Sequence, residues 1–180
     1  MTNNLINIVS GPIFQVAWVV EGIDAAEAEF SGRYGVEKWV RMPRMTFGPE
    51  QATYRGAPAD YTIDTSLGYA GGQQIELIAP VSGENLYTEQ LAKSGPGLNH
   101  IAWVPEDFDA ALAQAQAGGV EIVQHCAVPE IGMEFAYLSG GALGSYVELL
   151  RLPAEARAMF DGMIPEGYRN PWQLVAVKAV

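Results

Sequence analysis

The chain contains two closely similar stretches, FQVAWVVEGIDAA at residues 14–26 and NHIAWVPEDFDAA at residues 99–111. Aligned with an offset of 85 (100 − 15 = 85), they are identical at seven of their thirteen positions and pair Gln15 with His100. A repeat of this kind indicates a duplicated structural unit, because each copy preserves the same pattern of strand and helix residues.

A second match completes the repeat. QIELI at residues 74–78 resembles YVELL at residues 146–150, and an offset of 72 (148 − 76 = 72) pairs Glu76 with Glu148. The offset is smaller by 13 (85 − 72 = 13) than in the first match. The first copy must therefore have longer strands or loops between its two ends.

Each copy has the pattern of a βαβββ module. An extended run precedes an alanine-rich helix that is expected to stop at a glycine, and three extended stretches follow, separated by glycine and proline turns. The expected strands are 13–20, 36–46, 52–65 and 73–79 in the first copy and 99–104, 120–128, 133–139 and 144–151 in the second, with helices from Asp24 to Gly32 and from Glu106 to Gly118. The predicted fold class is therefore α+β.

The repeat also sets the expected boundaries along the chain. We assign residues 12–80 to the first module and 98–152 to the second. Residues 81–97 form a linker that holds Pro, Ser and Gly around the helix-compatible segment ENLYTEQLAK. Residues 153–180 are expected to hold a helix near 154–161 and a tail, WQLVAVKAV, that adds an edge strand or a dimer contact.

Composition excludes several classes of protein. The formal charge is −11, from 21 acidic and 10 basic residues, and no basic run is present, so nucleic acid is not an expected partner. A single cysteine, Cys126, rules out an intrachain disulfide. The start, MTNNLINIVSG, has no signal-peptide pattern, and no apolar run reaches the roughly 18 residues of a membrane span. A cytoplasmic protein without a membrane partner is expected.

Strand parity places the paired polar residues on one face. Side chains alternate along a strand, so Gln15 lies on the same face as Ala17 and opposite Trp18, and the second copy repeats this arrangement around His100. Glu76 and Glu148 are each flanked by apolar residues of the helix-covered side. All four polar side chains are therefore expected on the concave face.

Four donors at equivalent places in a duplicated motif predict a metal site. A single Glu or His on a strand is usually structural or solvated. Gln15, Glu76, His100 and Glu148 together supply three oxygen donors, one imidazole and two negative charges, which suit one divalent Zn, Ni, Co, Mn, Fe or Mg ion.

These motifs resemble the vicinal oxygen chelate superfamily. The resemblance rests on the strand with Gln15, on ELIAP from Glu76, on GLNHIAWVPEDFDAAL at 97–112 and on SYVELL at 145–150, and it covers roughly residues 12–152. It implies a cupped mixed sheet around a central cavity, with the metal held by the four residues above. The order Gln, Glu, His, Glu is similar to that of some glyoxalases. The second module looks closer to methylmalonyl-CoA epimerase, whose pattern has His first and Gln second.

The resemblance also implies a mechanism. We expect an isomerase, epimerase or lyase that transfers a proton next to a carbonyl through a metal-bound enolate, with Glu148 as the first choice of base and Glu76 as the second. The alternatives are lactoylglutathione lyase (glyoxalase I), a ring-cleaving dioxygenase, and a metal-free binding or resistance protein. A dioxygenase fits less well because it requires two histidines and one carboxylate.

The expected substrate is a small molecule, and the expected assembly is a homodimer. Tyr146 and Gln74 share the face of the two glutamates and are candidates for hydrogen bonds to substrate. Four further side chains would line a roomy cup suited to a bulky or aromatic substrate, although residues of this kind usually belong to the core. They are Phe47, Tyr54, Met133 and Phe135.

Overall fold

The computed structural model describes residues 8, 9 and 11–168, and the C-terminal segment WQLVAVKAV lies outside this range. One curled sheet, in the order β2-β5-β6-β1-β7-β10-β9-β8-β3-β4, runs through both halves of the chain. Its strands are β1 (Gln15–Val19), β2 (Trp39–Phe47), β3 (Ala52–Tyr54), β4 (Ala57–Pro58), β5 (Tyr61–Ala70), β6 (Gln73–Ser82), β7 (Gly97–Trp103), β8 (Ile122–Val128), β9 (Met133–Leu138) and β10 (Tyr146–Arg151). The helices are α1 (Ile23–Tyr34), α2 (Leu86–Ser94), α3 (Phe108–Ala117) and α4 (Ala154–Asp161), with short 3-10 turns at Pro129–Ile131 and Gly141–Leu143.

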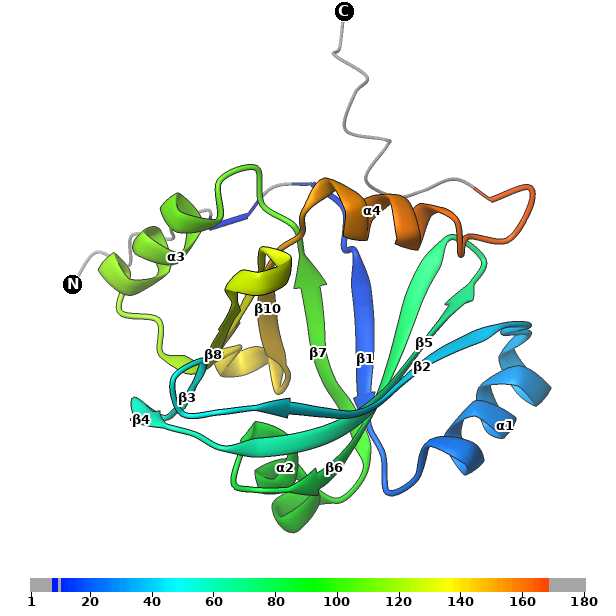
Figure 1. Cartoon of the computed structure of the whole chain (residues 1–180), viewed down its shortest axis with the longest axis horizontal. Coiled ribbons are helices and arrows are strands. Elements are labelled where there is room, and N and C mark those ends of the chain that lie inside the picture. Colours follow the sequence, from blue (N-terminus) through cyan, green and yellow to red (C-terminus); the bar gives the residue numbers. More distant parts are fainter. Residues whose placement is uncertain (1–7, 10, 169–180) are drawn as a thin grey trace, which may run out of the picture.

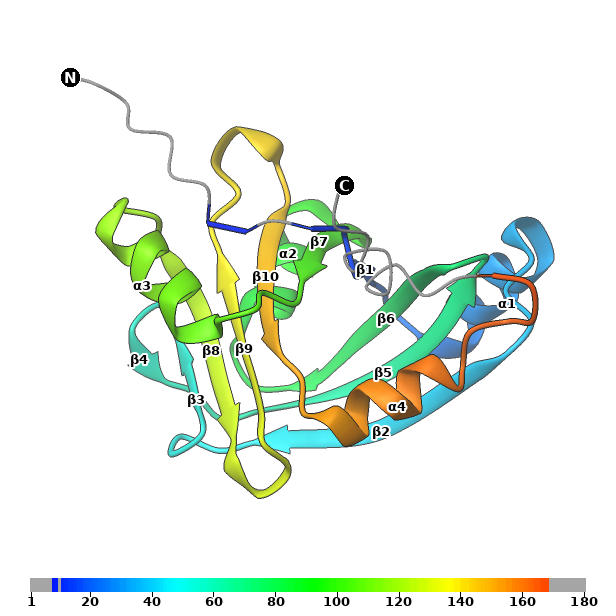
Figure 2. The same ribbon diagram turned by 90° about the horizontal axis from the view of Figure 1, so that it is seen from above.

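The two halves are related as the repeat predicts. β1 pairs in parallel with β6, β7 pairs in parallel with β10, and the antiparallel pair β1–β7 joins the halves. The sheet bends into a cup with α1 and α3 on its outer sides (Figures 1 and 2). The predicted α+β fold with a cupped mixed sheet is confirmed.

The stretch 52–65 of the first module differs from the prediction. It is not one strand, because the chain reverses at Arg55 and Gly56, both in the left-handed region with φ of 49° and 78°. The resulting β3–β4 hairpin pairs with β8 of the second module, where Ala52 lies opposite Cys126. This hairpin extends the sheet across the boundary between the modules.

Helix α1 continues past the predicted stop. It passes through Gly32 and ends at Tyr34, and Gly35 then adopts the left-handed conformation (φ 71°) that closes a helix C-terminus. A helix tolerates an internal glycine at a moderate cost in stability, so Gly32 alone does not end it. Helix α3 ends before Gly118, as expected.

Helices cover the sheet at three places. On the outside, Phe30 of α1 packs edge-on against Trp18 with ring centroids 5.0 Å apart. The apolar side of α3 packs on the outer face of the second module, against Leu149 among others. Phe160 of α4 is buried against Phe14, the residue just before β1. None of the helices in the described part of the chain is long and apolar enough to cross a membrane.

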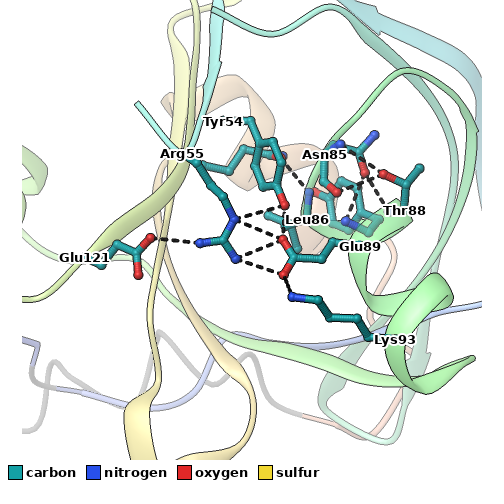
Figure 3. A network of polar contacts seen from close by, with 10 residues as sticks. Tyr54, Arg55, Asn85, Leu86, Thr88, Glu89, Lys93 and Glu121 are labelled. Carbon is teal, nitrogen blue, oxygen red and sulfur yellow. Dashed lines mark hydrogen bonds and ion pairs between the residues drawn. The ribbon is translucent and has the colours of Figure 1, made fainter. Parts of the chain in front are cut away.

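A charge network fastens the linker helix α2 to both modules (Figure 3). Arg55 of the β3–β4 turn donates to Glu89 of α2 at 2.9 Å and to Glu121, just before β8, at 3.1 Å. Tyr54 and Lys93 also donate to Glu89. The hydrogen bonds from Lys93 and Tyr54, opposed by burial and reinforced by Arg55, lower the pKa of Glu89 to about 2.

Replacing Glu89 by Gln is expected to reduce the free energy of unfolding by about 1 kcal/mol at neutral pH, because the variant lacks the negative charge shared by these donors. The folded-state pKa of Glu89 lies below its usual value of 4.5, so the contribution of Glu89 to stability is present above pH 4.5 and is lost as the pH falls towards 2. Urea unfolding of the wild-type and Glu89→Gln proteins from pH 2 to 7 measures this dependence of stability on pH.

Glu121→Gln is the control for this experiment, since Glu121 is half-exposed and bonds only Arg55 within the network. Glu121→Gln should reduce the free energy of unfolding by less than Glu89→Gln does. A difference between wild type and Glu89→Gln that stays constant down to pH 2 would contradict the role assigned to the carboxylate.

Candidate functional site

The four residues singled out by the repeat lie on the four central strands. Gln15 begins β1, while Glu76, His100 and Glu148 lie on β6, β7 and β10. Ala17 of β1 sits between Glu76 and His100, which are its register partners on either side. The second module repeats the arrangement, with Ala102 between Gln15 and Glu148. The register thus brings all four polar side chains to one place.

Their donor atoms meet at the Nε2 atom of His100. This nitrogen lies 3.2 Å from Gln15 Oε1, 3.4 Å from Glu76 Oε2 and 3.2 Å from Glu148 Oε2. The side chain of His100 is fully buried, and those of Glu148 and Glu76 are 6% and 14% exposed. Two carboxylates from different modules therefore flank one imidazole in a largely water-free setting.

An alanine lies between the donors in each module. Ala17 and Ala102 are fully buried, and the repeat preserves alanine at both positions. A larger side chain at either place would project among the donors, because register partners on neighbouring strands share a face.

Ala102→Leu is expected to weaken divalent metal binding by at least about tenfold and to destabilise the fold by about 1–3 kcal/mol through overpacking. Isothermal titration with Zn²⁺ measures the first effect, and thermal unfolding measures the second. Ile101→Leu is the matched control, since Ile101 is the half-buried neighbour on the opposite face of β7. Unchanged metal affinity in Ala102→Leu would contradict the placement of the site.

Charge and burial act in opposite directions at this cluster. Burial raises the pKa of Glu76, although its hydrogen bond to His100 opposes the change. Burial alone would lower the pKa of His100, but the charge and hydrogen bond of Glu148, together with those of Glu76, raise it to about 9. Without a cation, His100 is thus held as an imidazolium between the two carboxylates at neutral pH.

The four donors are of kinds that bind divalent ions. As they stand they form hydrogen bonds, and among residues 8, 9 and 11–168 no group of three or more His, Cys, Asp or Glu side chains has the arrangement of a metal cage. Ligands about 2.0–2.2 Å from one ion lie about 3.0–3.5 Å from each other. The three contacts of His100 Nε2 fall in that range.

The predicted polar substrate contacts have different surroundings. Gln74 is fully buried and bonded at both ends, accepting from Gln15 Nε2 at 2.7 Å and donating to the Tyr69 hydroxyl at 2.9 Å. It therefore fixes the amide of Gln15. Tyr146 is the register partner of His100 and lines a cavity of about 280 Å³ between α2 and the 140–145 turn.

The predicted apolar contacts are spread more widely. Phe47 and Phe135 are buried against each other, with ring centroids 5.7 Å apart. Tyr54 belongs to the network around Glu89. Met133, the first residue of β9, packs against the core and lines a separate cavity beside Pro153.

A buried tyrosine pair, Tyr87 and Tyr137, borders the site, and Tyr87 was not among the predicted site residues. Tyr137 is the register partner of Glu148, and its ring meets the imidazole of His100 edge-on with centroids 5.0 Å apart. The Tyr87 hydroxyl, from α2, donates to that of Tyr137 at 2.8 Å. Burial raises the pKa of both tyrosines well above the usual value, so both stay protonated. No periodicity in the linker indicated that Tyr87 would reach this site.

The sequence and the fold match a known family. The sequence model of the Glyoxalase/Bleomycin resistance protein/Dioxygenase superfamily, the vicinal oxygen chelate superfamily, matches residues 14–137. The chain belongs to this superfamily. No curated protein sequence matches the chain.

Solved structures of the superfamily share the fold at low sequence identity. Methylmalonyl-CoA epimerase from Mycobacterium tuberculosis is 20% identical with a TM-score of 0.59, covering 88% of this chain and 99% of the other. The Streptomyces coelicolor epimerase with 2-nitronate-propionyl-CoA is 21% identical with a TM-score of 0.56, covering 80% and 99%. A hypothetical protein from Bacillus halodurans is 20% identical with a TM-score of 0.60, covering 80% and 96%. At these identities the likeness concerns the fold.

Proposed function

We propose that this protein is a divalent-metal-dependent isomerase or epimerase that moves a proton at a carbon next to a carbonyl group. The observation that carries the proposal is the pair of carboxylates, Glu76 and Glu148, contributed by different modules and flanking His100 Nε2 at 3.4 and 3.2 Å. Inverting a stereocentre by proton transfer needs one group to remove the proton and another to return it from the opposite side. A pair of carboxylates from different modules supplies two such groups.

The proposed roles follow from the contacts. Gln15, Glu76 and His100 would hold the metal ion together with Glu148, and the ion would supply positive charge to stabilise the negative charge developing on the substrate oxygen. Glu148 is the proposed base. Glu76, from the other module, is the proposed group that returns the proton.

The proposed substrate class is a thioester or related carbonyl compound with an acidic neighbouring C–H bond. Structural relatives are methylmalonyl-CoA epimerases, one of them in complex with 2-nitronate-propionyl-CoA. The present chain has Gln15 and Glu76 where the resemblance gives the epimerase His and Gln, so a different acyl group is proposed. Tyr146 and the cavity of about 280 Å³ that it lines are the proposed approach to the site.

Deuterium exchange tests this proposal directly. The protein is loaded in turn with Zn²⁺, Ni²⁺, Co²⁺ and Mn²⁺ and incubated in D₂O with 2-substituted acyl thioesters, and the proton next to the carbonyl is followed by NMR. Metal-dependent loss of that signal together with racemisation is the expected result. Absence of both metal binding and exchange across the series would refute the proposal.

A glyoxalase-type lyase is the second candidate, because the donor order Gln15, Glu76, His100, Glu148 is similar to that of some glyoxalases. The same metal-loaded samples are assayed with the hemithioacetal of methylglyoxal and glutathione. Thioester formation there, without racemisation of the acyl thioesters, would favour the lyase.

The remaining alternatives are less well supported. The chain has two histidines. The second, His125 on β8, lies 2.8 Å from the carboxylate of Glu134 on β9. The two histidines and one carboxylate that a ring-cleaving dioxygenase needs therefore do not meet in the cup. Oxygen consumption with a catechol would still identify a dioxygenase. A metal-free binding protein would hold no metal after dialysis against Zn²⁺.

A further inference from the structure

A β-bulge brings Asn99 next to His100. Between β1 and β7, Trp18 pairs with Leu98 and Ala17 pairs with His100, so Asn99 has no partner on β1. Neighbouring residues of a regular strand point to opposite faces, but the extra residue of a bulge re-aims its side chain. Here the Oδ1 atom of Asn99 lies 2.8 Å from His100 Nδ1, and both residues are fully buried.

Two backbone carbonyls fix the side-chain amide of Gln90, and Gln90 in turn fixes that of Asn99. Gln90 Nε2, on α2, lies 3.2 Å from the carbonyl oxygens of both Gly97 and Leu98, and carbonyl oxygens only accept hydrogen bonds. Gln90 must therefore present its Oε1 to Asn99, whose Nδ2 donates to it at 2.8 Å. Asn99 is left with its oxygen facing the imidazole, and His100 Nδ1 must carry a proton to donate to it.

We infer that Asn99 is a positioning residue that keeps the proton of His100 on Nδ1 and directs Nε2 towards Gln15, Glu76 and Glu148. A histidine that ligates a metal needs one nitrogen free of hydrogen, and a partner on its other nitrogen sets the tautomer and the ring orientation. The metal part of this inference rests on the proposed function. The hydrogen bond from His100 Nδ1 to Asn99 Oδ1 is independent of the proposed function.

Two variants of Asn99 separate positioning from packing. Asn99→Leu keeps the volume but removes the acceptor, and Zn²⁺ affinity is expected to fall by about 10–100-fold. Asn99→Asp keeps an acceptor oxygen for Nδ1 but loses the hydrogen bond from Nδ2 to Gln90, so its affinity is expected to fall less than that of Asn99→Leu or to increase. Equal losses in both variants, or no loss in Asn99→Leu, would overturn the inference.

NMR provides a readout that does not require activity. In a His125→Gln background His100 is the only histidine, so long-range ¹H–¹⁵N spectra report its ring alone. We expect a downfield Nδ1 proton in the metal-free protein that exchanges slowly with water, and an upfield shift with faster exchange in Asn99→Leu. Near-UV circular dichroism establishes that each variant is folded.

This design keeps the two proposals apart. If the wild-type protein binds no divalent metal but shows the slowly exchanging Nδ1 proton, the proposed function fails and the role of Asn99 in fixing the imidazole stands. If metal binds but the Nδ1 proton is missing or is unaffected by Asn99→Leu, the role of Asn99 fails and the proposed function stands.

Discussion

The His100→Ala protein is expected to lose bound divalent metal, with affinity reduced by more than about 100-fold, and to lose activity with it. His100 Nε2 is the atom at which the other three donors meet, so its removal leaves two carboxylates without their shared partner. The fold is expected to persist, because the surrounding sheet pairs through the backbone. Metal content after equilibration with Zn²⁺, Mn²⁺ or Ni²⁺ and dialysis measures the loss.

His125→Ala is the matched control. It removes the only other histidine, which lies on β8 and bonds Glu134 rather than the central cluster. Metal content and exchange activity should stay at the wild-type level. Full metal occupancy in His100→Ala would refute the proposed chelate, whatever the activity of that protein.

Glu148→Gln is expected to retain metal, because the amide oxygen remains a donor, but to lower the rate of proton exchange by about 10²–10⁴-fold, since an amide cannot act as the base. Deuterium incorporation into the substrate, measured with both enantiomers, gives the rate in each direction. Unchanged exchange in Glu148→Gln would exclude this residue as the base.

Glu76→Gln separates removal of the proton from its return. If Glu148 removes the proton and Glu76 returns it, this variant should exchange the proton of one enantiomer with D₂O while losing racemisation. Equal losses of exchange and racemisation in Glu76→Gln would instead indicate that Glu76 acts mainly in holding the metal.

Much of the fold was predictable because the repeat is local in sequence. The matching segments around Ala17 and Ala102 indicate equivalent strands, and the two-residue period of a strand then assigns every side chain to a face. Gln15 and His100 follow from this parity, as do Glu76 and Glu148. The duplication and the parity predict that the four side chains face inward, and the pairing of the strands brings them together.

Other features depended on contacts that sequence periodicity does not carry. The β3–β4 hairpin pairs with β8, although Ala52 and Cys126 lie in different modules. Phe47 and Phe135, both candidates for a substrate surface, lie in different modules, and their rings pack against each other. A side chain that faces inward can line a cavity or fill it, and only the distance across the cup decides between these outcomes.

The sequence by itself thus determined the duplicated module and the four inward donors, because both follow from short-range alternation along single strands. The tertiary structure decided how these donors are held. The bulge that turns Asn99 towards His100 and the network that fastens Glu89 to Arg55 arise where strands and the linker helix meet. Such contacts depend on the register between segments distant in sequence, which no local pattern specifies.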